Sequence, residues 1–206
     1  WIVMRMSRRR KAARRLESLE IEVNEIRNNP LAYKYNKASA FARVNDDIMD
    51  RVKELKAKYD VCQSNITQCD ELFTRADDYL SAHKTRKSMA VMDELETMLD
   101  ETRTRIRIVN QSLDHILARE TEVREKSNAL KERFRNVKAV YQDNRSSFYN
   151  ASAVVDREIE DIENEFSNFE EWMFASEFNK AKEEVDKISR RVDEVSGLIA
   201  RTPGLY

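Results

Sequence analysis

The sequence is poor in the residues that make turns and cross-links. Its 206 residues include only two Gly, two Pro and two Cys. Because Gly and Pro make many of the sharp turns in proteins, such a chain can reverse direction only a few times. No stretch alternates between apolar and polar residues with period two, so we expect no sheet. The sequence therefore predicts an all-α fold made of a few long helices.

The usual sequence signatures of catalysis are missing too. Gly197 and Gly204 are the only glycines, which leaves no Gly-rich phosphate loop and no nucleophile elbow. The two histidines have no clustered partners; we interpret His83 as a solvated loop residue and His115 as a helix-surface residue. Most carboxylates lie three or four residues from Lys or Arg, as solvated ion pairs do. We expect no enzyme, no cofactor, no metal and no small-molecule substrate.

The two cysteines lie seven residues apart, at Cys62 and Cys69, on one predicted helix. That spacing separates them by about 10 Å, too far for a disulfide with each other. Both fall on the apolar face of the helix, and we interpret them as small buried hydrophobes in a reducing cytosol. A metal site, the alternative, would need further ligands.

What the sequence does have is charge: 36% of its residues are charged and 41% are apolar, with strict periodicity. This composition is typical of long helices and not of disorder. The net charge of −1 hides an asymmetry, because residues 1–15 hold seven basic residues and no acid. The remainder carries 30 basic and 38 acidic residues, a net of −8. An acidic protein with one basic end is not expected to bind nucleic acid, which needs basic charge spread along a face.

The longest periodic stretch runs from about Met89 to Tyr141 and contains no Gly or Pro. Its 4-3 spacing predicts a helix of roughly 80 Å with a single apolar seam. Only Thr102, Glu120 and Ser127 interrupt the apolar residues, so partner helices must cover the seam. The seam positions are Met92, Leu95, Leu99, Thr102, Ile106, Val109, Leu113, Ile116, Glu120, Val123, Ser127, Leu130, Phe134, Val137 and Tyr141.

Two helices are predicted before this stretch. The first runs from Arg14 to Arg27 and ends at residues 28–30, because a residue before Pro disfavours the helical region. Residues 31–37 are expected to form a loop. The second helix runs from about Ser39, its predicted N-cap, to Ala82, with a seam that passes through Val44, Ile48 and Val52 in steps of four. Residues 81–86 are the predicted hairpin tip.

Two more helices are predicted after it. A turn-forming cluster at residues 142–147 ends the long helix, and the fourth helix spans about Tyr149 to Phe174. A tight turn then leads to the fifth helix, which ends near Thr202. Its stripe matches that of the fourth, so the two are antiparallel neighbours. The fifth helix carries Ala181, Val185, Ile188, Val192, Val195 and Ile199 on its stripe.

The predicted architecture is a set of elongated spectrin-like repeats that share the long helix. Residues 1–12 would be the end of a transmembrane anchor with its basic flank. Residues 13–118 would form the first repeat, a long antiparallel coiled-coil hairpin, and residues 119–206 the second, a three-helix bundle closed by Val123 to Tyr141. This arrangement requires the long helix to continue unbroken through Glu120.

The N-terminus resembles the last half-turn of a membrane helix followed by a basic cytoplasmic flank. Four to six apolar residues cannot span a bilayer, so the spanning part would have to lie upstream. The alternatives are an ordinary solvated helix start or a peripheral anchor. The predicted membrane-flanking residues are Trp1, Arg5, Arg8, Arg9, Arg10, Lys11, Arg14 and Arg15.

A second candidate surface lies near the end of the fourth helix. There an acidic patch with Glu165 stands beside two aromatic residues, and exposed aromatics often dominate binding. A plain solvated face, with the aromatics capping the bundle, is the alternative. The predicted partner-docking residues are Glu170, Glu171, Trp172 and Phe174.

Several segments resemble the EzrA family of septation ring formation regulators from low-GC Gram-positive bacteria. The basic start and residues 15–18 resemble that family's segment after its membrane helix. Residues 120–138 are similar to its Leu-x-x-x-Tyr-Arg-x-Leu-Arg run, and residues 159–170 to its Ile-Glu-x-x-Phe-x-x-Phe signature. Ser176 departs from the family, which usually has Gly in this turn.

The resemblance implies a single-pass protein of the cell membrane, with the bulk of its chain in the cytoplasm at the division septum. It would contact FtsZ and other divisome proteins and modulate FtsZ ring assembly and septum placement. The alternative is a helical lipid-binding or membrane-remodelling module that uses residues 8–15 on anionic headgroups. A homodimer also stays open, because apolar seams serve dimers as well.

Overall fold

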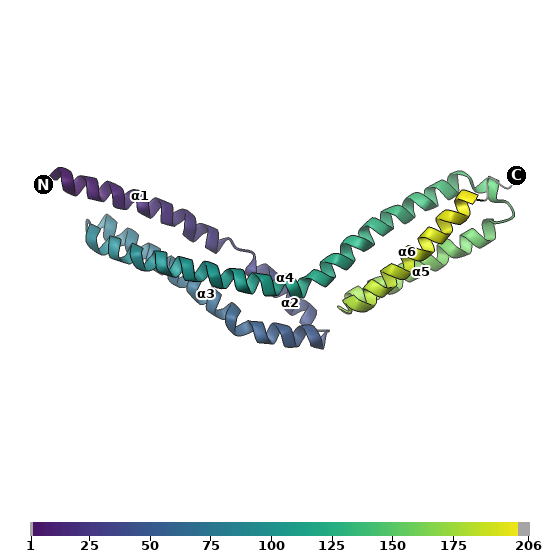
Figure 1. The fold of residues 1–206 in the computed structure, drawn as a ribbon, viewed down its shortest axis with the longest axis horizontal. Coiled ribbons are helices and arrows are strands. Elements are labelled where there is room, and N and C mark those ends of the chain that lie inside the picture. Colours follow the sequence, from purple (N-terminus) through teal and green to yellow (C-terminus); the bar gives the residue numbers. More distant parts are fainter. Residues whose placement is uncertain (1, 202–206) are drawn as a thin grey trace. The chain divides into compact units, whose positions relative to one another are not determined.

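The computed structural model describes residues 2–201, apart from the side chains of Ile2 and Arg5 (Figure 1). The described residues form helices joined by short turns and contain no strand, which confirms the all-α prediction. The elements are α1 (Ile2–Arg27), α2 (Leu31–Ala42), α3 (Asp46–Ser81), α4 (Thr85–Asp143), the short 3-10 helix η1 (Arg145–Phe148), α5 (Ser152–Phe174) and α6 (Phe178–Arg201).

The chain divides into two compact units that share α4. Unit 1 comprises Trp1–Ala40 and Asp47–Ile116, and unit 2 comprises Phe41–Asp46 and Leu117–Tyr206. The 59 residues of α4 continue through Glu120 without a break, as the shared-helix prediction requires. Every predicted seam position of α4 is buried or half-buried. The 4-3 spacing therefore identified the inner face of this helix correctly.

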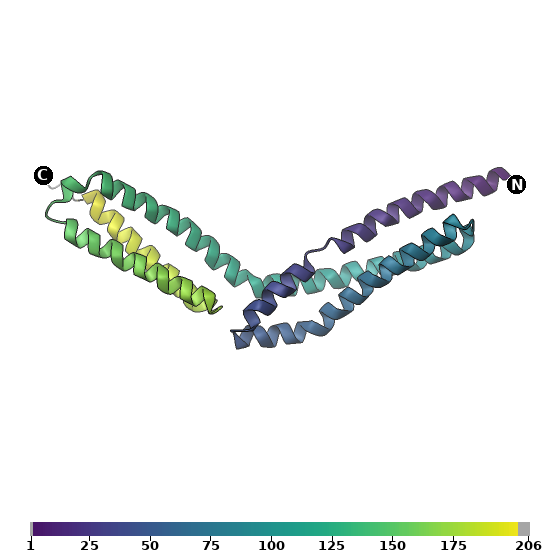
Figure 2. The ribbon, with the colours of Figure 1, turned by 180° about the vertical axis from the view of Figure 1, so that it is seen from behind.

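In unit 1, α3 and the first part of α4 form an antiparallel hairpin, and α1 followed by α2 runs along it (Figures 1 and 2). The buried core of this unit draws on all three long helices. Burial of each large apolar side chain contributes about 1.5–3 kcal/mol before entropy is counted. The core residues are Ala12, Leu16, Leu19, Val23 and Ile26 of α1, Cys69, Ala76 and Leu80 of α3, and Val91, Met92, Leu95 and Leu99 of α4.

The two cysteine thiols lie inside unit 1. Cys62 and Cys69 are both 0% exposed, which confirms their interpretation as buried small residues. Burial raises the pKa of both thiols above the ordinary value for cysteine. Cys69 Sγ also lies 3.6 Å from Oγ1 of Thr102, one of the polar residues in the seam of α4.

The prediction that residues 31–37 form a loop is wrong, because they begin α2. Asn29 and Pro30 stop α1 and also start the next helix. The Asn29 side-chain Oδ1 accepts a hydrogen bond from the Leu31 backbone N–H at 2.8 Å, as an N-cap does. Pro30 then occupies the first helical position, where its missing N–H has no consequence. The sequence pattern was interpreted only as a stop signal.

The predicted start of the second helix at Ser39 is also wrong. Ser39 lies inside α2, and the chain breaks its helix at residues 43–45 before α3 begins at Asp46. Val44, placed on the seam from sequence, is 57% exposed at this break, whereas Ile48 and Val52 are buried. The steps of four therefore mark a change of helix rather than a local unwinding of one supercoil.

In unit 2, the second part of α4, α5 and α6 form a three-helix bundle (Figures 1 and 2). The rings of Phe134 and Phe166 lie 5.7 Å apart between α4 and α5. Lys138 Nζ lies 3.0 Å from Oε1 of Glu163 across the same pair of helices. All six predicted stripe residues of α6 are buried. The helix before it begins at Ser152, three residues later than expected, because η1 occupies the turn.

The α2–α3 corner, residues 41–46, belongs to unit 2. The Phe41 ring packs edge-on against Phe178, with centroids 4.8 Å apart. The Asn45 side-chain amide donates a hydrogen bond to the backbone carbonyl of Ser176 at 2.9 Å. These contacts cover the α5–α6 turn.

The hairpin turns of both units end their helices in the same way. At the α3–α4 turn the His83 N–H donates to the Leu80 carbonyl and the Lys84 N–H to the Tyr79 carbonyl, which is a Schellman motif. The α5–α6 turn repeats this pattern around Ser176. His83 and Ser176 accordingly adopt left-handed conformations, with φ of 60° and 55°. Glycine is the residue that this position favours, because a Cβ strains it.

The two exposed histidines allow a paired test of the turn. His83→Gly is expected to raise the free energy of unfolding by about 1 kcal/mol, because it relieves left-handed strain. His115→Gly is expected to lower it by about 1 kcal/mol, because it places glycine inside the exposed face of α4. Urea unfolding followed by circular dichroism measures both changes. If both substitutions change the free energy of unfolding in the same direction, the left-handed conformation assigned to His83 is contradicted.

Candidate functional site

The first candidate surface is the start of α1, which extends past the tip of the α3–α4 hairpin (Figures 1 and 2). The first core residue of α1 is Ala12, so we call residues 2–11 the basic overhang. Its cations Arg8, Arg9, Arg10 and Lys11 are exposed, as is Arg14 one turn later. Exposed apolar side chains lie beside them: Val3, Met4 and Met6 are 80%, 66% and 56% exposed.

Not all of the predicted membrane-flanking residues belong to this surface. Arg15 forms ion pairs that join α1 to α4, because its Nη2 lies 2.6 Å from Asp93 and 2.9 Å from Glu96 on α4. The hydrogen bond to Glu96 raises the pKa of Arg15 above its ordinary value. Trp1 lies outside the described residues, and the side chain of Arg5 is not described. Within residues 2–201, none of the helices combines the length and the hydrophobicity of a membrane-spanning segment.

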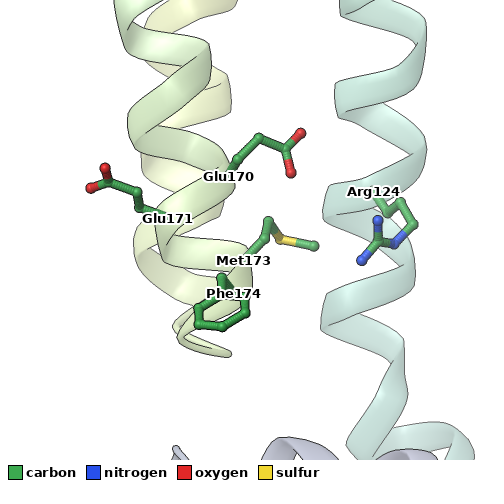
Figure 3. A pocket seen from close by; sticks show the side chains of 5 residues that line it. All are labelled: Arg124, Glu170, Glu171, Met173 and Phe174. Carbon is green, nitrogen blue, oxygen red and sulfur yellow. The ribbon is translucent and has the colours of Figure 1, made fainter.

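The second candidate surface is an open groove of about 570 Å³ at the C-terminal end of α5 (Figure 3). Phe174 stands at its edge and is 90% exposed, so it does not cap the bundle. Trp172 is half-buried instead, with Lys180 Nζ 4.7 Å from the centre of its ring. We call this surface the Phe174 groove, and its lining residues are Arg124, Glu170, Glu171, Met173 and Phe174.

Three of the four predicted docking residues therefore line one groove, and two lining residues were missed. Met173 belongs to the buried stripe of α5 and is only 8% exposed. Arg124 comes from α4 and aims its guanidinium toward α5 (Figure 3). No local signal in the sequence could have found Arg124, because its place in the groove depends on how the two helices pack.

Most charges in the Phe174 groove already have a partner. Arg124 Nε donates to Oε1 of the buried Glu120 at 2.6 Å. Lys131 Nζ lies 2.5 Å from Oε1 of Glu170. Among the described residues, Glu171 is exposed and has no ionic partner. The groove thus keeps one uncompensated carboxylate, that of Glu171.

Glu165 does not belong to the acidic patch in which the sequence placed it. It is 7% exposed and faces α6, where Arg191 Nε lies 3.1 Å and Lys187 Nζ 3.5 Å from its Oε1. Glu165 lies three residues after Ile162 and four before Phe169, both buried, so it shares their inward face. Closeness in sequence was the wrong criterion for this carboxylate.

The described residues contain no cluster of side chains that could bind a metal ion. No group of three or more His, Cys, Asp or Glu side chains in residues 2–201 lies close enough together to hold a metal ion. His83 and His115 are both exposed, as interpreted from sequence. The features of interest therefore lie on the surface of the bundles. The fold and these surfaces define an all-α protein of helical bundles that share a helix.

The comparisons with known proteins identify the family. A model of the EzrA family, described as the septation ring formation regulator, matches residues 1–206, and the chain belongs to this family. Over 198 residues it is 20% identical to the septation ring formation regulator EzrA of Geobacillus sp. (strain WCH70). That alignment covers 96% of this chain and 35% of the relative, so the chain spans about a third of the relative's length. No solved structure matches the chain significantly.

The burial of Glu165 predicts a clear difference between two neighbouring arginines of α6. Arg191→Ala is expected to lower the free energy of unfolding by about 1–3 kcal/mol, because it removes a partner from a buried carboxylate. Arg190→Ala, which truncates an exposed side chain, is expected to change it by less than about 0.5 kcal/mol. Chemical denaturation measures both variants. Similar losses in the two would mean that Glu165 is not held by Arg191.

Proposed function

We propose that this chain is part of a regulator of bacterial cell division that acts by binding other proteins at the division septum. The observation that carries the proposal is the match of the EzrA family to all 206 residues. The family is described as a regulator of septation ring formation and not as an enzyme. Surfaces made of exposed helix faces support that description, because they offer contacts to partner proteins.

The proposed partner is FtsZ, together with other divisome proteins, and the proposed mechanism needs no chemistry. Each of the two units presents exposed helix faces on a bundle built around its own part of α4. A partner protein bound to these faces would have some of its own assembly contacts covered, and its orientation would be restricted. In this way the protein would modulate assembly of the FtsZ ring and placement of the septum.

We further propose that the protein works at the cytoplasmic face of the cell membrane. The support comes from the basic overhang, whose exposed cations suit a position beside anionic headgroups. Arg8 to Lys11 have no structural task in the core of unit 1, which begins at Ala12. A single membrane-spanning anchor would place the overhang at that surface.

A homodimer, which the sequence left open, would have to use a face other than the seam of α4. The seam of α4 is covered by helices of the same chain in both units, with Leu113 0% and Val123 0% exposed. The same seam therefore cannot also join two copies, and a dimer would need another face.

Co-sedimentation with FtsZ filaments tests the proposed function. The fragment is expected to pellet with filaments assembled in GTP and to change the amount of FtsZ that pellets. The fragment alone, centrifuged without FtsZ, is the control for self-association. A fragment that stays in the supernatant and leaves FtsZ assembly unchanged would refute this function for these residues.

A second candidate function is a helical lipid-binding or membrane-remodelling module. The observation that favours it is the basic overhang itself, with four consecutive exposed cations at Arg8 to Lys11 and apolar side chains at Val3, Met4 and Met6. Such a segment can bind an anionic surface without any spanning anchor.

Vesicle flotation measures the lipid contribution. Changing Arg8, Arg9, Arg10 and Lys11 to Gln is expected to weaken binding to phosphatidylglycerol vesicles by about 1 kcal/mol per cation removed. The matched control changes the exposed Arg51, Lys53, Lys56 and Lys58 of α3 to Gln. The lipid module is supported if the unmodified chain binds the vesicles strongly and salt weakens this binding. The control substitutions in α3 should then leave the binding unchanged. Equal effects of the two variants would show a diffuse effect of charge.

A further inference from the structure

We propose that the Phe174 groove docks an apolar segment of a partner protein that carries lysine or arginine. The proposal names the surface and the partner chemistry for the protein contact proposed above, and it rests on that function for its biological setting. Phe174 lies on the outward face of α5, four residues after the exposed Glu170 and three after the exposed Glu171. Its large ring is 90% exposed, whereas the stripe residues of the same helix are covered.

The groove is held in place before any partner arrives. The turn after α5 fixes the backbone around Phe174, because the Ser176 N–H donates to the Met173 carbonyl at 3.0 Å and the Glu177 N–H to the Trp172 carbonyl at 2.9 Å. Met173 forms an apolar wall toward α4 (Figure 3). An aromatic side chain has few rotatable bonds, so on a fixed backbone it loses little conformational entropy on binding, and such residues are typical binding hot spots.

Charge decides which apolar segment fits. Arg124, the basic residue in the lining, is paired with Glu120, and Lys131 is paired with the lining residue Glu170. Glu171 has no such partner among the described residues, so its negative charge stays uncompensated. The local field therefore attracts a cation next to the apolar contact. A lysine or arginine of the partner would reach Glu171 while its apolar neighbour packs on Phe174.

Two fluorescein-labelled peptides of equal length test this inference. They share the same leucines and one phenylalanine, and their charged positions are all Lys in one peptide and all Glu in the other. Fluorescence anisotropy with the unmodified chain is expected to show binding of the Lys peptide and much weaker binding of the Glu peptide. Equal binding of both, or tighter binding of the Glu peptide through Arg124, would overturn the proposal.

Variants locate the binding. Phe174→Ala is expected to weaken binding of the Lys peptide by about tenfold or more. Glu171→Gln is expected to weaken it about threefold and to reduce its dependence on salt. Matched controls are Tyr149→Ala, an aromatic that is 88% exposed elsewhere in unit 2, and Glu160→Gln, an exposed acid of α5. If Phe174→Ala binds as the unmodified chain does, the groove is not the docking site.

The same variants separate this inference from the proposed function. Loss of FtsZ co-sedimentation in Phe174→Ala, with unchanged circular dichroism, would support both proposals. A fragment that pellets with FtsZ equally well with and without Phe174 would refute the groove as the FtsZ contact and leave the division role standing. The chain could also bind the Lys peptide through Phe174 and yet fail to pellet with FtsZ. That result would refute the proposed FtsZ contact and support the groove as a docking site.

Discussion

The structure depends on burial of one apolar seam along α4. The helix is 59 residues long and supplies core residues to both units, such as Leu95 and Leu113 in unit 1 and Val123 and Phe134 in unit 2. A helix with a stripe this long is not stable alone in water, because most helical stability in proteins comes from packing of the apolar face. The other helices are arranged so as to cover that stripe, and the surfaces that face outward are set by this requirement.

Three polar residues interrupt the apolar seam of α4, and they differ in how their buried polar groups are satisfied. Thr102 is 0% exposed and donates its hydroxyl to the Met98 carbonyl at 2.6 Å, so it is satisfied within its own helix. Glu120 is 1% exposed and binds Arg124, which links the core of unit 2 to the wall of the Phe174 groove. Among the described residues, the Ser127 hydroxyl is buried without a hydrogen-bond partner. Such positions remove apolar contact from the seam, and the hydrogen bonds of Thr102 and Glu120 inside α4 offset part of that loss.

Residues that are neighbours in sequence take different tasks because a helix turns by about 100° per residue. Arg14 is exposed, whereas Arg15 is tied to Asp93 and Glu96 on α4. Glu165 is buried against Arg191, whereas Glu170 and Glu171 one to two turns later line an open groove. A charge cluster in a helical sequence is therefore divided between fold and surface. Only its exposed part remains available to a membrane or a partner protein.

The sequence by itself determined the helical class, the inward face of α4 and α6, the position of the α3–α4 hairpin tip and the burial of both cysteines, because each follows from local periodicity or turn chemistry. It left α2 unrecognised, since Asn29 and Pro30 both end one helix and begin the next. Only the tertiary structure decided that Arg191 meets the buried Glu165, that Phe174 stays exposed and that Arg124 joins its groove. Those outcomes depend on which helix lies opposite, and residues far apart in the chain set that partner through packing.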